Sequence, residues 1–175
     1  MRANETTPQR TTPPGELPAR PDDGHKGTFG TAIIVAGQTH MIGAPAFCAS
    51  AALASGVGLA RIATSYQVMR DALRIEPAAT GIALDDDPAV AYQRLAEECE
   101  SQKNVALAMG PGMGTDVSRH HLIDRLIAMH RPTVIDADGL NSLALHGIPT
   151  LHVSCILTPH PGEFRRLAEA CNLDA

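Results

Sequence analysis

The chain has 175 residues, of which 44% are hydrophobic and 19% are charged, a balance typical of one folded domain with a hydrophobic core. Its formal net charge is −5 and it contains no run of basic residues, which argues against a nucleic-acid binder of the electrostatic kind. Aromatic residues make up only 3% and tryptophan is absent, so the sequence offers no aromatic platform for stacked bases.

Four cysteines are scattered without a Cys-x-x-Cys pair, which argues against a zinc site and against a disulfide framework. No run of about 18 apolar residues is present, and the N-terminus lacks the apolar stretch of a secretory signal. We therefore expect no membrane partner, a cytoplasmic location, and cysteines that serve as small buried side chains.

The first 23 residues are polar and contain five prolines, which predicts a disordered or extended leader. From residue 24 the composition changes, and we expect one domain over residues 24–175. Its first strand is predicted over Thr31–Ala36, where three β-branched residues follow one another. Lys26 precedes this strand, and both contact with a phosphate and plain solvation stay open for it.

Residues 43–55 predict a helix built from small residues, with Pro45 in its first turn, where the missing N–H costs little. So many alanines and serines allow its backbone to lie close to a sheet or to a second copy of the helix. Gly56-Val57-Gly58 ends this helix, and Leu59–Thr64 is the second predicted strand.

Helical spacing of apolar residues recurs over 65–75 and 88–102. Between these helices, residues 76–87 predict no regular element. The acidic run Asp85-Asp86-Asp87 is interpreted as a solvated loop or a helix cap rather than a metal site.

The stretch Val105–Gly114 is the most informative part of the chain. Five apolar residues predict a buried strand, and three glycines follow, spaced by Pro111 and Met113. Glycines leave no Cβ between a ligand and the backbone N–H groups, and a helix capped by Thr115 or Asp116 comes next. Strand, glycine turn and helix together predict a site for a nucleotide or another anion, with a tight turn that binds nothing as the alternative.

Residues 132–135 and about 153–157 are the remaining predicted strands, and a last helix covers 162–172. Strands alternate with helices five times, which predicts an α/β fold with a mostly parallel central sheet and helices on both faces. Ligands of such sheets bind beyond the carboxyl ends of the strands. The segments that follow four of these strands are rich in glycine and polar residues and are expected to converge at one edge: 36–38, 110–114, 136–141 and 158–163.

Asp136 and Asp138 follow a strand and are two residues apart, so in extended geometry both carboxylates point the same way, toward Mg²⁺ or a sugar hydroxyl. The alternative is that Asp138 or Asn141 caps the helix that begins near Leu140. The Asn141 side chain offers donors and an acceptor, which suits an amide or a ribose.

His160 lies between two prolines that restrict the backbone and hold its imidazole in place, which favours contact with a ligand. Glu163 falls at the next helix start, where capping is the default and contact with substrate or metal the alternative. The pair His120-His121 is predicted on the exposed face of its helix, and a metal role is disfavoured.

These motifs resemble the ADP-dependent NAD(P)H-hydrate dehydratase family, whose members have a ribokinase-like fold. The matching segments occur in the family's order from about Leu17 to the end of the chain, and five in register are specific. They are H-K-G-T-F-G (25–30), G-A-P-A-F-C-A-S-A-A-L-A-S-G-V-G-L (43–59), A-M-G-P-G-M-G (108–114), V-I-D-A-D-G-L-N (134–141) and I-L-T-P-H-P-G-E-F (156–164).

The resemblance implies a lyase that repairs nicotinamide cofactors. It removes water from the S epimer of hydrated NADH or NADPH, consumes ADP as co-substrate with Mg²⁺ as the expected ion, and releases AMP and phosphate. The implied chemistry is phosphoryl transfer to the ring hydroxyl, followed by elimination of phosphate. The positions that it places in the hydrated-cofactor site are Ala44, Gly112, Gly114, Asp138, Asn141, His160 and Glu163.

Members of this family continue beyond the point where this chain stops, and carry there a G-T-G-D motif whose aspartate is the expected catalytic base. We therefore expect the catalytic residue beyond Ala175 and little or no turnover from these 175 residues alone. The resemblance also implies a homo-oligomer, commonly a tetramer, in the full-length form. A ribokinase-like kinase of a small hydroxyalkyl heterocycle and a non-catalytic nucleotide-binding module stay open as alternatives. A classical dinucleotide dehydrogenase is disfavoured, because no G-x-G-x-x-G follows the first strand.

Overall fold

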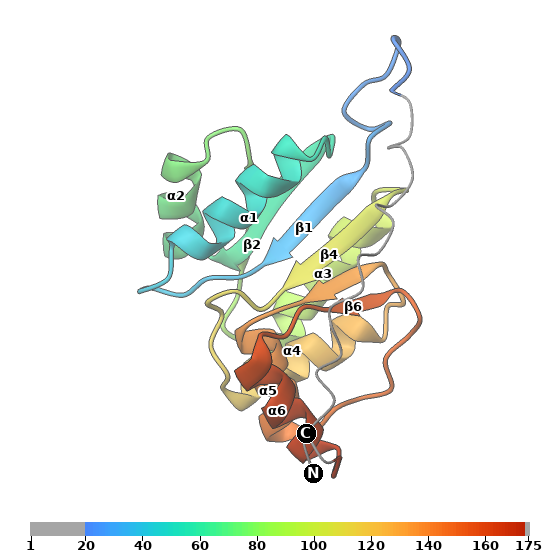
Figure 1. The fold of residues 1–175 in the computed structure, drawn as a ribbon. Helices are drawn as coiled ribbons and strands as arrows, with labels where there is room; N and C mark the ends of the chain where they lie inside the picture. Colours follow the sequence, from blue (N-terminus) through green and yellow to red (C-terminus); the bar gives the residue numbers. More distant parts are fainter. Residues whose placement is uncertain (1–19, 174–175) are drawn as a thin grey trace.

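A computed structural model describes residues 20–173, so most of the predicted leader, residues 1–19, lies outside the described residues. Six parallel strands form one sheet with helices on both faces, which confirms the predicted α/β architecture (Figure 1). In chain order the elements are β1 (Thr31–Val35), α1 (Gly43–Ala54), β2 (Leu59–Ser65), α2 (Tyr66–Ile75), β3 (Thr80–Leu84), α3 (Pro88–Glu100), β4 (Val105–Met109), α4 (Val117–Ile127), β5 (Thr133–Ile135), α5 (Asp138–His146), β6 (Cys155–Leu157) and α6 (Pro161–Ala170).

The strand order is β3-β2-β1-β4-β5-β6, so the chain begins in the middle of the sheet and builds outward in both directions. Crossovers between parallel strands are right-handed, and a reversal of direction therefore moves the connecting helices to the other face. Helices α1 and α2 pack on one face, whereas α3, α4 and α5 pack on the other (Figure 1). The reversal lies between β1 and β4.

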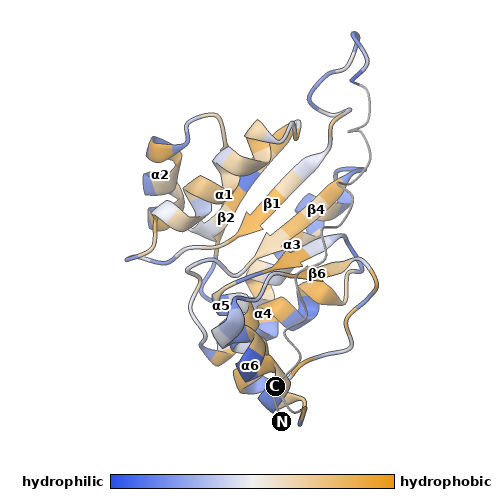
Figure 2. Ribbon diagram, viewed as in Figure 1, coloured by the Kyte–Doolittle hydropathy of each residue, from blue (hydrophilic) through white to orange (hydrophobic). Residues whose placement is uncertain are grey.

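Alternating side chains of the strands form a separate core on each face of the sheet. Along β1, Ile33 and Val35 pack with α3, α4 and α5, whereas Ile34 packs with α1 and α2. The second core is rich in alanine, such as Ala46 and Ala49 of α1, so the helix backbones lie close to the strands. Hydrophobic residues dominate the strands and much of α1 (Figure 2).

Strand β3 was not predicted, because residues 76–87 carry only two large buried apolar side chains, Ile82 and Leu84. Gly81 directly precedes this pair, and α2 approaches closely there, since a Cβ at Gly81 would overlap with the Met69 sulfur. The sheet therefore has six strands rather than five. The loop-or-cap interpretation of the acidic run is confirmed, since Asp87 is the N-cap of α3 and accepts a hydrogen bond from the Ala89 N–H at 2.8 Å.

The predicted exposure of His120 is wrong. His121 is exposed, but His120 is only 6% exposed and its ring lies 5.2 Å from the His146 ring of α5, measured between centroids. The face of α4 that packs on α5 is thus partly polar, which the apolar pattern of the helix does not reveal.

The last residues of the predicted leader contact the domain. Arg20 donates from Nη1 to the carbonyl oxygen of Gly56 at 2.7 Å, and its guanidinium lies 3.6 Å from the centroid of the Phe29 ring. The domain boundary near residue 24 stays a prediction. Within residues 20–173, no helix has the length and hydropathy that crossing a bilayer requires.

Candidate functional site

The crevice between the carboxyl ends of β1 and β4 is the natural ligand site of this topology. The direction of the sheet reverses there, and ligands of such sheets bind at this point, beyond the carboxyl ends of the strands. The segment after β1 is Gly37–Ile42, and the segment after β4 is the glycine loop, Gly110–Gly114.

The glycine loop is hydrogen-bonded to the end of β1 and to the segment that follows it. The Gly110 N–H donates to the carbonyl oxygen of Val35 at 3.1 Å, and the Gly37 N–H donates to that of Pro111 at 2.9 Å. All three loop glycines have positive φ angles: 122° at Gly110, 64° at Gly112 and 83° at Gly114. This backbone is strongly unfavourable for residues with a side chain.

Gly110 has a structural role that the sequence analysis did not foresee. A Cβ at this position would overlap with the carbonyl oxygen of Asp136 and would lie 2.7 Å from the Gly139 nitrogen. Gly110 therefore allows the segment after β5 to pack directly on the segment after β4. Only Gly112 and Gly114 remain for the predicted contact with a ligand.

Asp138 connects the two segments. Its Oδ2 accepts a hydrogen bond from the Gly114 N–H at 3.0 Å. The N-cap of α5 is Ala137, with no side-chain cap, so neither Asp138 nor Asn141 caps this helix. Asp138 instead fixes the end of the glycine loop.

The extended geometry expected for Asp136 and Asp138 is wrong. The chain turns sharply at Ala137, which has φ 50° and ψ −120°, and Asp138 is already helical. A non-glycine residue in such a conformation stores about 1–3 kcal/mol of strain, which recurs at functional sites.

The start of α1 faces the glycine loop. A Cβ at Gly112 would lie 2.7 Å from the Met41 Cβ and 3.4 Å from the Ala44 Cβ, and one at Gly114 would lie 3.2 Å from Oε1 of Gln38. Ala44, Gly112, Gly114 and Asp138 are therefore brought together. The sequence analysis did not single out Gln38 and Met41 individually; the signal for Gln38 is its place directly after the first strand.

Cys48 lies one turn further along α1, and the charge of Asp136 at the same edge of the sheet acts on its thiol. Burial raises the pKa of the Cys48 thiol above its usual value, and the negative charge of Asp136 raises this pKa further. The thiol is thus protonated at neutral pH and is no nucleophile in this site.

Asn141, His160 and Glu163 form a second group on α5 and α6. Oδ1 of Asn141 accepts a hydrogen bond from Nε of Arg166 at 2.9 Å, which links the two helices. His160 is the N-cap of α6, and Glu163 accepts from its backbone N–H at 2.9 Å through Oε2. The capping role predicted for Glu163, which is 5% exposed, is confirmed.

The His160 ring is held by this cap as well as by its prolines. Nδ1 accepts from the N–H groups of Gly162, at 3.0 Å, and of Glu163, at 3.4 Å. An acceptor nitrogen carries no proton, so the proton of the neutral ring is on Nε2, which lies 3.2 Å from Oε1 of Glu163. The His160 side chain is 62% exposed.

Both groups lie at the carboxyl edge of the sheet, because each follows a parallel strand. The Thr158 N–H donates to the carbonyl oxygen of Ile135 at 3.3 Å, which sets the segment after β6 beside the segment after β5. Lys26, by contrast, precedes β1 and lies at the opposite, amino edge. The binding roles of the seven candidate residues stay predictions.

The described residues do not form a resident metal site. Nowhere in residues 20–173 do three or more His, Cys, Asp or Glu side chains form a group able to hold a metal ion. Oδ2 of Asp138, predicted as a possible Mg²⁺ ligand, accepts a hydrogen bond from the glycine loop.

Comparison with known proteins decides the family. The model of the family described as NAD(P)H-hydrate dehydratase matches residues 32–174, most of the chain. The chain belongs to the NAD(P)H-hydrate dehydratase family. The resemblance based on the five sequence motifs is thereby confirmed.

Two relatives in this family are informative. The bifunctional NAD(P)H-hydrate repair enzyme Nnr of Salinibacter ruber is 40% identical over 162 residues, which cover 86% of this chain and 29% of that protein. The ADP-dependent (S)-NAD(P)H-hydrate dehydratase of Bacillus subtilis is 33% identical over 151 residues, which cover 86% of this chain and 51% of that protein. The chain thus spans about half, or less, of the length of these dehydratases.

Solved structures of similar proteins support the same family and fold. The ADP/ATP-dependent NAD(P)H-hydrate dehydratase of Bacillus subtilis, co-crystallised with ATP/Mg²⁺, matches with a TM-score of 0.70 and 33% identity over 87% of this chain and 52% of that one. A ribokinase-like superfamily protein of Enterococcus faecalis matches with a TM-score of 0.70 at 22% identity, which supports the fold alone. The predicted ribokinase-like fold is confirmed.

Proposed function

We propose that this chain serves the ADP-dependent dehydration of the S epimer of hydrated NADH or NADPH, which restores the cofactor and yields AMP and phosphate. Membership of the dehydratase family supports this proposal. Hydroxide is a poor leaving group, and transfer of phosphate from ADP to the ring hydroxyl would replace it with a better one.

The observation that carries the proposal is the glycine loop in the crevice between β1 and β4. The Gly112 N–H donates to no other described residue, although the residue is buried, so it is available to a ligand. Asp138 accepts a hydrogen bond from the Gly114 N–H of the loop, and Ala44 lies beside Gly112. We propose that Asn141, His160 and Glu163 complete the binding surface at the β5–β6 side.

We propose that the described residues bind the hydrated cofactor, and we assign no catalytic base to them. ADP as co-substrate, an accompanying Mg²⁺ and a cytoplasmic location stay predictions.

Binding is therefore the measurement that tests the proposal. In calorimetric titrations of the full chain, the S epimer of NADPH hydrate is expected to bind more tightly than the R epimer and than NADPH itself. Adding ADP and following the absorbance of the reduced nicotinamide then measures turnover. Binding without turnover identifies a nucleotide-binding module. No affinity for either epimer, together with ATP-dependent phosphorylation of a hydroxyalkyl heterocycle, would replace the dehydratase by the kinase.

We further propose that the protein is a homo-oligomer that self-associates through α1. This helix is apolar around its whole circumference, which is typical of a helix that is covered on all sides. Ala46 and Ala49 face the sheet, whereas Phe47, on the outer side, is 70% exposed.

Replacing Phe47 with serine is expected to lower the mass of the particle measured by light scattering, because it removes the largest exposed apolar side chain of α1. Phe164→Ser on α6, where the ring is 57% exposed, is the matched control and should leave the mass unchanged. A wild-type chain that is monomeric at every concentration would refute the proposal.

A further inference from the structure

A cavity lies at the amino edge of the sheet, on the opposite side from the glycine loop. Its volume is ≈ 680 Å³, and it is lined by residues of the H-K-G-T-F-G segment, by the first residues of β1, β2 and β3, and by residues 101–104. A neighbouring cavity of ≈ 360 Å³ shares Gly30, Thr31, Lys103 and Asn104 with it.

The charge of this cavity is unusual for a chain with a net charge of −5. Lys26, Arg61 and Lys103 line it, together with His25, and no carboxylate does. The whole sequence contains only two lysines, and both of them are here. Hydroxyl and amide groups, such as those of Thr80 and Asn104, complete the lining.

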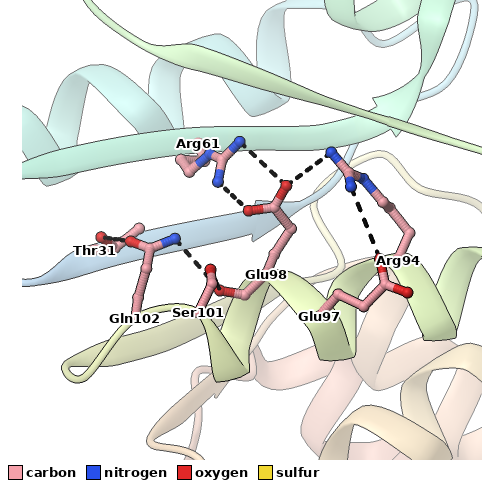
Figure 3. Close-up of polar contacts among 7 residues, drawn as sticks. All are labelled: Thr31, Arg61, Arg94, Glu97, Glu98, Ser101 and Gln102. Atoms are coloured by element: carbon pink, nitrogen blue, oxygen red, sulfur yellow. Dashed lines mark hydrogen bonds and ion pairs between the residues drawn. The ribbon is translucent and has the colours of Figure 1, made fainter.

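The two lysines, unlike the arginine, lack a carboxylate partner among residues 20–173. Arg61 pairs with Glu98 of α3, and Glu98 also pairs with Arg94 at 2.9 Å (Figure 3). The positive charge of Arg61 is therefore compensated by Glu98, whereas Lys26 and Lys103 line the cavity without such a partner among residues 20–173.

Backbone contacts join the two segments that carry the lysines to the sheet. The Thr31 N–H donates to the carbonyl oxygen of Asn104 at 2.8 Å, and the Leu59 N–H donates to that of Gly30 at 3.1 Å. A Cβ at Gly58 would overlap with the carbonyl oxygen of Lys26, so the backbone of this lysine is packed directly on β2. Gln102 accepts a hydrogen bond from the Thr31 hydroxyl and ties residues 101–104 to β1 (Figure 3).

We propose that this cavity binds a small molecule with a diphosphate or longer phosphate chain, which Lys26 and Lys103 hold from two sides. An ammonium group on a flexible stem is a strong point-charge partner for phosphate oxygens, and the hydroxyl and amide groups of the lining supply further donors. The site is separate from the carboxyl-edge crevice, so the proposal is independent of the dehydratase assignment.

Calorimetric titrations of the full chain with inorganic pyrophosphate, ADP and adenosine at low salt test this proposal. Pyrophosphate is expected to bind and adenosine is not. Lys26→Gln and Lys103→Gln should each weaken pyrophosphate binding about tenfold, since each removes one charge-assisted contact. Arg165→Gln, which removes an exposed charge on α6, is the control and should change nothing. If ADP binds more tightly than pyrophosphate through the same lysines, the ligand is a nucleotide. If ADP and pyrophosphate bind equally tightly, the site recognises the phosphate chain alone.

Amine labelling of the wild-type chain gives a second reading that does not depend on variants. Because only two lysines are present, mass spectrometry reports the acylation rate of each, and pyrophosphate should slow both. Absence of pyrophosphate binding at low salt, or acylation rates that pyrophosphate leaves unchanged, would overturn the proposal. Hydrated-cofactor binding that survives in both lysine variants keeps this outcome distinct from failure of the proposed function.

Discussion

Replacing Gly110 with alanine is expected to lower the free energy of unfolding by about 4 kcal/mol, the largest effect of a single small substitution in this chain. Two penalties combine at this position. The φ angle of 122° is strained for any residue with a side chain, and the added Cβ overlaps with the carbonyl oxygen of Asp136. Relief of the overlap would separate the glycine loop from the segment after β5.

Gly147→Ala is the matched control, because Gly147 has the same φ angle of 122° but no atom within 4 Å of the added Cβ. It should cost only the backbone strain, about 1–3 kcal/mol. Urea unfolding of both variants, followed by circular dichroism, gives the difference between them. Equal losses of unfolding free energy in the two variants would mean that the Asp136 carbonyl moves aside freely. The contact between the segments after β4 and β5 would then not be fixed.

Asp138→Ala is expected to weaken binding of the S epimer of NADPH hydrate about tenfold. The substitution leaves the Gly114 N–H without its acceptor, so the end of the glycine loop is no longer held in the conformation that receives the ligand. Loss of such a hydrogen bond costs about 1–3 kcal/mol of stability when the donor stays buried. Calorimetric titration of the hydrated cofactor and urea unfolding measure the two effects separately.

Asp87→Ala serves as the control for this experiment. Asp87 also accepts a backbone N–H, from Ala89 at 2.8 Å, but it caps α3 beside the edge strand β3. Its removal should cost about 1 kcal/mol of stability and leave the affinity for the hydrated cofactor unchanged. If both variants retain full affinity, Asp138 has only a structural role.

Local patterns predicted most of the secondary structure correctly. The β-branched run of β1 and the small residues of α1 depend on neighbours in the sequence, which is why their positions were predicted to within a residue. Strand β3 was missed for the opposite reason. It is stabilised by pairing with β2 and by the close approach of α2 at Gly81, and neither contact leaves a local pattern.

The candidate site was predicted only as a set of segments. That the segments after parallel strands meet at one edge follows from strand direction, and so does the opposite location of Lys26, which precedes β1. Strand direction does not predict which side chains contact each other at that edge. The predicted pairing of Asp136 with Asp138 failed at the turn of Ala137, and the hydrogen bond from Gly114 to Asp138 spans 24 residues of sequence.

The amino-acid sequence by itself determined the alternation of strands and helices, the glycine loop and the family, because each of these depends on residues that are close together in the chain. Only the tertiary structure decided why Gly110 must be glycine, that His120 is buried against α5, and that both lysines line one cavity. The physical reason is that these properties arise where segments far apart in the chain are packed together. Strand order and helix packing set those contacts, and both are properties of the whole fold.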